Sequence, residues 1–500
     1  MLIVCILLAI GLSVRMVNLG KEYSGDESSL VEMAHMGFDK MIGELKSREI
    51  YPPLTYTLVH LWSFINDSTA WLRMYFVLFG AGSCLLAYLI AKEYLGGKFA
   101  LLVLLLAVFS PLLISVSQIL RSYSDSAFWL LLSTYFMIRI IKGKDTLFDW
   151  SAYTAASALA LYTFYFSALF IFSQFVYVVL FMGRDKKLIF KWILSLAAAG
   201  LVFAPWVPSA LGQFRNASSI YYDWSDKGFN VGPLRLGLYV RNLASLAGLD
   251  PSFMVLPGGV QAHFSKAALA SIVVASCGAL IFFVYNSFSF LKNKFKNAGE
   301  NRLLWLPFFL AFLPLFFSWL FAGFLNTLPT AKYFAVSHSM FLMLVAAFIG
   351  SLWSRNRWVS IISLSLILLV FASRIPAAVS PEFDYRKSIA FLNGNLAKND
   401  RLICVNSPPD VSVSKNAVII EGRFISLNTQ RSAYMPLPDQ AWADIRKKIN
   451  PCRSVWLYRV QGHFELFGLY AQVDDFLKKE GYTAVEKHRF RNIDIVKFEK

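Results

Sequence analysis

Two adjacent carboxylates stand in the run SGDESS, shortly after the first apolar stretch of the chain. They are Asp26 and Glu27. A carboxylate in a partly dehydrated cleft can act as a general base, because loss of water raises its pKa toward the working pH. The same pair also suits the start of a helix, where negative charge is favoured. Both interpretations stay open on this motif alone.

The second motif is the corner YPPLTY, which begins at Tyr51. Pro52 and Pro53 predict an extended entry into an apolar helix that runs on to Ile65. An aromatic and proline-rich corner suits the binding of a lipid headgroup. Anchoring of an aromatic ring at a membrane interface is the alternative.

The third motif is SQILRSYSD, which gathers Gln118, Arg121, Tyr123 and Asp125 at a helix junction. An arginine can hold a phosphate through two hydrogen bonds, while a tyrosine and an acid can bind sugar hydroxyls. A structural alternative exists, because Arg121 and Asp125 are four residues apart and can pair along one helix face.

Two further places carry polar groups of the same kind. Tyr165 lies in an aromatic turn that divides a long apolar run, and Lys332 with Tyr333 lies in the run LPTAKYF before a late apolar stretch. A lysine there can bind the phosphate of a lipid-linked donor. It can equally extend its ammonium group to the interface without a function.

The elements that carry these residues must lie in a membrane. The 500 residues are 57% hydrophobic and 16% charged, with a mean hydropathy of +0.52. A water-soluble protein cannot bury so much apolar surface. Long apolar runs recur up to about Ala372, and a helix of roughly 18 or more such residues crosses the hydrocarbon layer. We therefore expect an all-α polytopic membrane protein.

The apolar runs predict about eleven transmembrane helices. The run 151–182 is too long for one span, so we divide it near Tyr162 to Phe166; the piece 53–65 is too short to cross and is interpreted as a juxtamembrane or re-entrant helix. The remaining predicted spans are 1–19, 71–91, 99–116, 124–141, 188–208, 267–290, 303–325, 330–350 and 357–373.

The positive charges predict the orientation of these spans. Loops on one side collect fifteen Lys and Arg against five acids, and we assign them to the cytoplasm by the positive-inside rule. The opposite, extracytoplasmic side receives the segments 20–70 and 209–266, all the motifs above and the chain after residue 373. We expect a multi-pass protein of the inner or plasma membrane. The net charge of +17 fits loops of this kind, and we expect no binding of nucleic acid.

The composition changes after the last apolar run. We expect a transmembrane catalytic domain over residues 1–373 and a small extracytoplasmic α/β domain over residues 374–500. RLICVN and SVWLYRV predict buried strands, and VDDFLKKEGY predicts a helix that leads to a final strand pair. Cys404 and Cys452 lie in this tail, and their spacing does not decide whether they form a disulfide.

The order of these motifs resembles a known family. An acidic pair after the first span, a YPPL corner, an S-Q-x-x-R-x-Y segment, an aromatic turn and a late P-x-x-K-Y start are similar to bacterial members of the protein mannosyltransferase superfamily. These are GT-C fold glycosyltransferases that use polyprenyl-phosphate sugars, related to family 39 and to the aminoarabinose transferase of lipid A. FDYRKSIAFLN and the closing GYTAVEKHRF and IDIVKFEK segments resemble the outer domain of that group.

The resemblance implies roles for single residues. Asp26 matches the proposed catalytic base and Glu27 its partner, Tyr51 to Leu54 the juxtamembrane corner, and Arg121 with Tyr123 the second-loop motif. Lys332 and Tyr333 match the donor-phosphate end. The second-loop motif of the family usually reads Q-E-A-R, and here Ile119 occupies the place of the acid. Either Asp125 supplies the second carboxylate, or the site works with Asp26 and Glu27 alone.

The resemblance thus implies a hexosyl- or pentosyltransferase that inverts the configuration of the donor sugar in one step. The implied partners are a polyprenyl-phosphate-linked sugar, membrane lipids and an acceptor that is a glycolipid, a polysaccharide or a protein. No cofactor is certain, although a divalent cation at Asp26 and Glu27 is compatible with the sequence. A lipid or polysaccharide transporter and a non-catalytic scaffold of the same fold are the alternatives.

Overall fold

The computed structural model describes most of the chain. The described ranges are 1–23, 25–47, 49–224, 305–325, 330–381, 385–397, 400–405, 424–427, 439–450, 452–460, 466–490 and 493–500. The predicted span 267–290 and residues 225–266 of the outer segment 209–266 lie outside these ranges.

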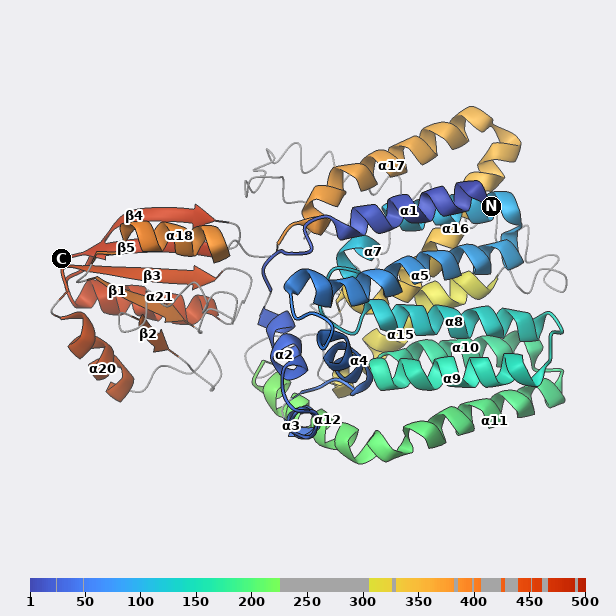
Figure 1. Ribbon diagram of the computed structural model, residues 1–500, viewed down its shortest axis with the longest axis horizontal. Coiled ribbons are helices and arrows are strands. Elements are labelled where there is room, and N and C mark those ends of the chain that lie inside the picture. The colour runs from blue at the N-terminus through green and yellow to red at the C-terminus, as the bar shows by residue number, and fades with distance from the viewer. Residues whose placement is uncertain are drawn as a thin grey trace. The chain divides into compact units, whose positions relative to one another are not determined.

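The membrane part is a bundle of helices, most of them aligned with one another (Figure 1). Its long helices are α1 (Leu2–Met16), α5 (Thr69–Leu95), α6 (Gly97–Phe109), α8 (Ser124–Ile141), α9 (Leu147–Thr163), α10 (Ser167–Met182), α11 (Lys186–Phe203), α12 (Val207–Trp224), α15 (Leu306–Leu325), α16 (Ala335–Arg355) and α17 (Arg357–Val379). The short 3-10 turns η1 (Ala204–Trp206) and η5 (Ala331–Phe334) precede α12 and α16.

Four helices in the described ranges are long and apolar enough to cross a membrane. They are Thr69–Leu95, Lys186–Arg215, Ala331–Arg355 and Arg357–Val379. Shorter apolar helices are Leu2–Met16, Gly97–Phe109, Ser167–Met182 and Leu306–Leu320. The mostly helical membrane fold agrees with the sequence analysis, and the number of eleven spans stays a prediction.

The predicted span 99–116 is broken in the structure. Helix α6 ends at Phe109, and α7 (Pro111–Val116) begins again after Ser110. Pro111 ends the first helix because it has no N–H to donate, and the Ser110 hydroxyl accepts from the N–H of Leu113. Buried Arg15 donates to the carbonyls of Ala107 and Val108, both at 3.0 Å, so the last carbonyls of α6 are satisfied inside the bundle.

The long run 151–182 divides where the sequence predicts it. Helix α9 ends at Thr163 and α10 begins at Ser167, with Phe164 in an extended conformation between them. Several of the candidate site residues from the sequence analysis lie in this turn and near the starts of α8 and α16.

Short helices fill much of the segment between α1 and α5. They are α2 (Gly25–Ala34), α3 (Phe38–Ser47) and α4 (Leu54–Ser63). The sequence predicts α4 through its apolar run after Pro53, and it offers a helix start at Asp26 and Glu27 as one of two interpretations of that pair. Helices α3 and α4 lie at one end of the bundle (Figure 1). Trp62 and Trp71 stack at 4.7 Å between ring centroids and join the end of α4 to the start of α5.

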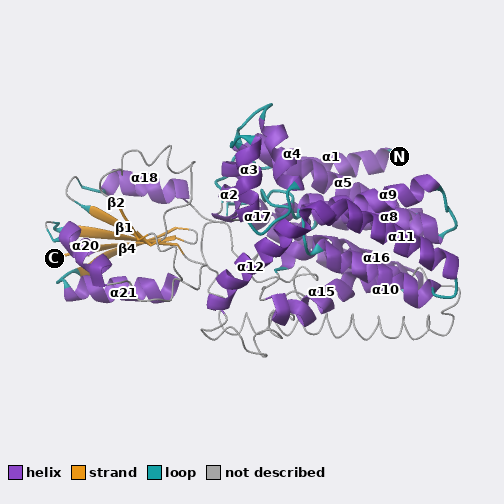
Figure 2. Cartoon of the chain, turned by 90° about the horizontal axis from the view of Figure 1, so that it is seen from below, coloured by secondary structure: helices purple, strands orange, loops and turns teal. Residues whose placement is uncertain are grey.

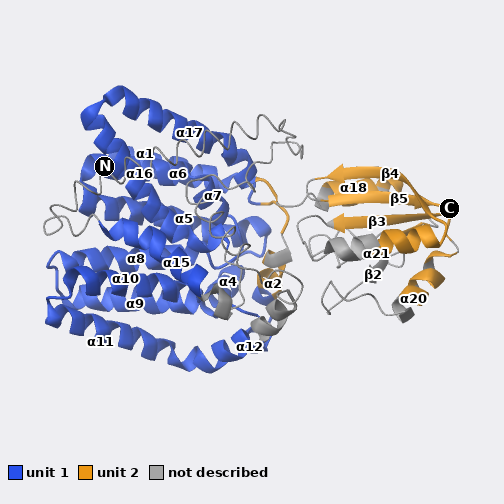
Figure 3. Ribbon diagram, turned by 180° about the vertical axis from the view of Figure 1, so that it is seen from behind, with its two compact units in different colours: residues 1–19, 33–256, 261–379 blue, residues 20–32, 257–260, 380–500 orange. Residues whose placement is uncertain are grey.

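The chain divides into two compact units (Figure 3). The first consists of residues 1–19, 33–256 and 261–379, and the second of residues 20–32, 257–260 and 380–500. Most of the second unit is an α/β domain with helices α18 (Tyr385–Asn395), α20 (Asp439–Ile449) and α21 (Leu466–Lys479).

The α/β domain is built on a sheet in the order β2-β1-β3-β5-β4. Its strands are β1 (Arg401–Val405), β2 (Phe424–Leu427), β3 (Ser454–Val460), β4 (Thr483–Phe490) and β5 (Ile493–Glu499). Strand β1 pairs in parallel with β2 and β3, whereas β5 is antiparallel to β3 and β4. The strands, the helix and the final strand pair that the sequence predicts are confirmed.

Helices cover both faces of this sheet (Figure 2). Side chains alternate along β3, so Val455 and Leu457 pack with α20 and α21, while Trp456 and Tyr458 pack with α18. Both sets are fully buried, so the strand has apolar residues on both of its faces. The sequence therefore shows a continuous apolar run here instead of an alternating pattern.

Candidate active site

A pair of tyrosines forms the centre of the candidate site in the first unit. Tyr51 precedes α4 and Tyr123 precedes α8, and their hydroxyls share a hydrogen bond of 3.2 Å. Both side chains are buried. Burial, and next the nearby phenol of Tyr51, raises the pKa of Tyr123 well above its ordinary value. Tyr123 therefore stays neutral, and its hydroxyl can both donate and accept hydrogen bonds.

Two cations lie on the rings of this pair. The guanidinium carbon of Arg121 lies 4.9 Å from the centroid of the Tyr51 ring, and the ammonium nitrogen of Lys332 lies 5.4 Å from that of Tyr123. Cations over aromatic faces at these distances are attracted by the ring quadrupole. The second-loop arginine and the late lysine, which are far apart in the sequence, thus lie against one pair of bonded tyrosines.

Arg121 is held by two further groups. Its Nη1 donates to the hydroxyl of Tyr56 at 2.9 Å and lies 3.6 Å from a carboxylate oxygen of Glu49. Only about a tenth of each of the two charged side chains is exposed, so water screens their attraction weakly. The sequence suggests a pair of Arg121 with Asp125; the structure shows Glu49 and Tyr56 against Arg121 instead.

Other rings extend the tyrosine pair into an aromatic cluster, which comprises Tyr51, Tyr123, Phe164, Phe166 and Tyr333. Tyr333 stacks on Tyr123 at 5.3 Å, and Phe164 stacks on Tyr51 at 5.9 Å between ring centroids. Phe166 lies 5.1 Å from Tyr333. The corner before α4, the start of α8, the turn between α9 and α10 and the turn η5 therefore meet at one place.

Tyr165 points away from the aromatic cluster and anchors it indirectly. Its hydroxyl donates to Oε1 of Gln213 and accepts from the indole N–H of Trp206 at 2.9 Å. Burial raises the pKa of Tyr165 to about 12. Nε2 of Gln213 in turn donates to the carbonyls of Leu45 and Tyr51, at 2.5 and 3.2 Å. This relay fixes the backbone of the proline corner from helix α12.

Pro52 and Pro53 set the local geometry of the corner. Pro53 is the residue before the first turn of α4, and the Thr57 N–H donates to its carbonyl at 2.9 Å. A proline fits here because the first turn of a helix needs no N–H donor from it. The corner thus turns Tyr51 toward the bundle and begins α4 at once.

Asp125 joins three helices. The hydroxyl of Thr55 on α4 donates to its carboxylate at 2.7 Å, and the hydroxyl of Tyr75 on α5 donates at 3.3 Å. The other carboxylate oxygen accepts from the N–H of Ser126 at 3.0 Å. Asp125 is completely buried, so it is engaged in packing at the start of α8.

Gln118 lies at the end of α1. Its amide donates to the carbonyls of Arg15 and Val17, both at 2.8 Å, and its side chain is completely buried. These bonds satisfy carbonyls that the last turn of α1 leaves without an intrahelical partner. Ile119, which stands in the place of the family's second-loop acid, lies between Gln118 and the buried Leu120.

Asp26 and Glu27 fall in the first turn of α2, within the second compact unit. The helix start that the sequence suggests is therefore present. Glu27 is buried, while the side chain of Asp26 lies outside what the structure describes. In the described part of the chain no three or more His, Cys, Asp or Glu side chains form a group fit for a metal ion.

Two residues of the site escaped the sequence analysis. Glu49 and Gln213 are single polar residues in a loop and a helix, and only tertiary contacts reveal them. Phe164 and Phe166 flank the predicted Tyr165 in the aromatic turn that the sequence indicates.

Comparison with known proteins agrees with the resemblance that the motifs indicate. Residues 51–208 match the family model described as dolichyl-phosphate-mannose-protein mannosyltransferase. This range contains the proline corner, the second-loop motif and the aromatic turn. No curated protein sequence matches the chain closely enough to count as a relative.

Solved structures share the fold at low sequence identity. ArnT from Cupriavidus metallidurans bound to undecaprenyl phosphate is 11% identical with a TM-score of 0.51, covering 99% of this chain and 97% of that one. The oligosaccharyltransferase AglB from Archaeoglobus fulgidus, in complex with an inhibitory peptide and a dolichol-phosphate, is 13% identical with a TM-score of 0.50, covering 91% and 69%. The chain thus has the GT-C fold of these membrane proteins, and its residues 51–208 carry the sequence pattern of a glycosyltransferase family.

Proposed function

We propose that the protein is a membrane glycosyltransferase that moves a sugar from a polyprenyl-phosphate donor to an extracytoplasmic acceptor. The acceptor is a glycolipid, a polysaccharide or a protein, and the configuration of the donor sugar is inverted. The family pattern over residues 51–208 and the fold support the reaction class. The undecaprenyl phosphate bound to ArnT and the dolichol-phosphate bound to AglB support the kind of donor.

One observation carries the proposal, namely the approach of Arg121 and Lys332 to the bonded pair Tyr51 and Tyr123. A phosphate that leaves a sugar carries growing negative charge, and fixed cations stabilise it most where water is excluded. The tyrosine hydroxyls add neutral hydrogen-bond donors beside these cations. Arg121 and Lys332 thus have the chemistry to bind the donor phosphate before and after transfer.

The proposed reaction is a direct displacement at the anomeric carbon. The acceptor oxygen forms a bond to that carbon while the bond from the carbon to the phosphate oxygen breaks. Asp26 takes the proton of the acceptor hydroxyl, Glu27 assists it, and the lipid phosphate departs with the electron pair of the broken bond. Asp125 acts as a positioning residue in this scheme, because its oxygens are occupied by Thr55, Tyr75 and Ser126.

The test is donor binding after removal of each cation. We expect Arg121→Met and Lys332→Met to weaken the binding of undecaprenyl phosphate to the purified protein. Each charge-assisted hydrogen bond contributes roughly 1.5 to 3 kcal/mol, so the loss should be about ten- to hundred-fold. Lys142→Met is the matched control, because Lys142 pairs with Glu93 at 2.8 Å on another loop and should leave binding unchanged.

Unchanged donor affinity in both Arg121→Met and Lys332→Met would refute the phosphate assignment. If the parent protein binds the lipid phosphate but transfers no sugar from any polyprenyl-phosphate donor, the transporter alternative would replace the enzyme.

A further inference from the structure

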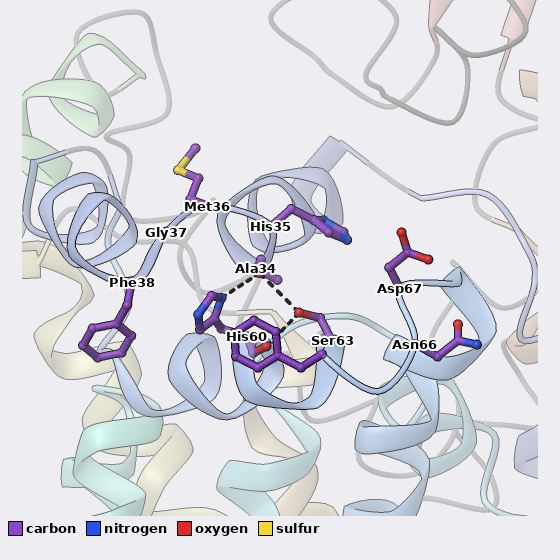
Figure 4. A pocket seen from close by; sticks show the side chains of 10 residues that line it. Ala34, His35, Met36, Gly37, Phe38, His60, Ser63, Asn66 and Asp67 are labelled. Carbon is purple, nitrogen blue, oxygen red and sulfur yellow. Dashed lines mark hydrogen bonds between the residues drawn. The ribbon is translucent and has the colours of Figure 1, made fainter.

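A separate hollow lies in the first unit, beyond the groups assigned to the donor. It has a volume of about 790 Å³ and lies between the end of α2, the start of α3 and the end of α4 (Figure 4). Its lining residues are Ala34, His35, Met36, Gly37, Phe38, His60, Ser63, Phe64, Asn66 and Asp67. We call it the α4 pocket.

His60 presents one defined hydrogen-bonding atom at this pocket. The side chain is buried, and its Nδ1 lies 2.8 Å from the carbonyl oxygen of Ala34. A carbonyl only accepts, so Nδ1 carries a proton, and in this tautomer of imidazole Nε2 is an acceptor. Among the described residues Nε2 has no hydrogen-bond partner. Figure 4 shows the hydrogen bonds of His60 and Ser63 that meet at the Ala34 carbonyl.

Two aromatic rings hold the imidazole and offer apolar surface. Phe64 lies 4.8 Å from His60 and Phe38 lies 6.1 Å from it, measured between ring centroids. Phe64 is 73% exposed and Phe38 is 48% exposed, so much of each ring is open to a ligand. A ligand that covers them gains by burial of apolar surface.

The polar groups of the α4 pocket indicate the charge of its ligand. Asn66 and Asp67 are exposed at its edge, and no Lys or Arg is among the residues that line it. A phosphate or another anion would find no cation here. A neutral molecule with hydroxyl groups suits Nε2 of His60 and the Asp67 carboxylate, since both accept from hydroxyls. A sugar ring has such hydroxyls and also an apolar face of C–H groups.

We propose that the α4 pocket binds a sugar ring of the acceptor, with a hydroxyl donating to Nε2 of His60 and the C–H face against Phe38 or Phe64. The inference rests on the proposed function and narrows its acceptor to a glycolipid or a polysaccharide. Helix α4 connects the two places, because Tyr56 binds Arg121 and His60 follows one turn later, about 6 Å along the axis.

The test uses sugar probes on the full-length protein in nanodiscs of phosphatidylethanolamine and phosphatidylglycerol. Binding of octyl β-D-glucoside, galactoside and mannoside and of maltohexaose is measured by saturation-transfer NMR. We expect at least one probe to bind and to bind at least about five-fold more weakly to His60→Asn. Asparagine can still donate to the Ala34 carbonyl, but it has no atom in the place of Nε2. His60→Gln, which has a polar atom near that place, should recover part of the binding.

Two controls separate this inference from the proposed function. Asp39→Asn, at an exposed residue of α3 outside the lining, should bind the probes as the parent does. Undecaprenyl phosphate should bind equally to His60→Asn and to the parent, whereas Arg121→Met should lose donor binding and keep the sugar probes. Binding of octyl glycosides alone identifies a glycolipid acceptor, and binding of maltohexaose a polysaccharide. The inference fails if no probe binds, or if His60→Asn binds as the parent does.

Discussion

The proposed function assigns the general base to Asp26. Replacement by Asn preserves the size of the side chain and removes the base, so transfer should fall by at least ~10²-fold, the low end for general base catalysis. The protein should still fold, because Asn is accepted at the start of a helix nearly as well as Asp. Initial rates of sugar transfer by purified protein measure the effect, with donor binding as the check on integrity.

A purely structural role for Asp26 predicts a different result. If its carboxylate only favours the start of α2, Asp26→Asn retains nearly full activity. Loss of transfer in Asp125→Asn together with full activity in Asp26→Asn would place the base in the second loop. In that case Asp125 supplies the carboxylate that the family carries at the position of Ile119.

At the scale of elements, Asp125 should act as the joint between α4, α5 and α8. Thr55→Val removes one donor to its carboxylate, and Asp125→Asn weakens all the bonds it accepts. We expect each change to lower the thermal midpoint of the protein in detergent, since a broken buried hydrogen bond costs about 1 to 3 kcal/mol. The double variant should lose less than the sum of the single losses, because both changes remove the same contact.

Additive losses in that double-mutant cycle would show that Thr55 and Asp125 stabilise the bundle independently. Ser83→Ala is a suitable reference, since the hydroxyl of Ser83 donates within its own helix, to the carbonyl of Phe79 at 2.9 Å, and has no other partner in the described part of the chain. Its effect should add to that of Asp125→Asn.

Local sequence patterns predict the helices and strands better than they predict the contacts between these elements. Apolar runs and Pro53 predict α4, and the aromatic run near Phe164 predicts the division between α9 and α10. The break at Ser110 was missed although Pro111 marks it, because the apolar run continues through it and the freed carbonyls are satisfied by Arg15, a residue about 90 positions away.

In the candidate site, too, some residues can be predicted from local patterns and others only from tertiary contacts. Arg121, Tyr123, Lys332 and Tyr333 could be selected by residue type near the ends of predicted spans, and the structure brings them together. Glu49 and Gln213 could not, because a lone acid or amide in a loop or helix gives no periodic signal. Their significance comes from a partner on another element, Arg121 for Glu49 and the Tyr51 carbonyl for Gln213.

At the scale of the whole molecule, the proposal requires the segment before α5 and the C-terminal domain to face the same, extracytoplasmic side. The prediction rests on the loop charges, because fifteen Lys and Arg gather in the loops assigned to the cytoplasm. Polyprenyl-phosphate sugars can reach an extracytoplasmic acceptor only if the reacting groups open to that side.

Labelling of single cysteines in intact cells tests this orientation. In a variant without its five native cysteines, an exposed probe position is introduced by Lys46→Cys on α3, Lys487→Cys on β4 or Lys187→Cys at the start of α11. We expect a membrane-impermeant maleimide to label the first two in intact cells, because both should face outward. The third should react only after the membrane is permeabilised, since its loop carries the positive charge of the cytoplasmic side. The opposite pattern would put the α4 pocket and the Arg121 and Lys332 site on the cytoplasmic side, and a donor and acceptor available there would have to replace those proposed above.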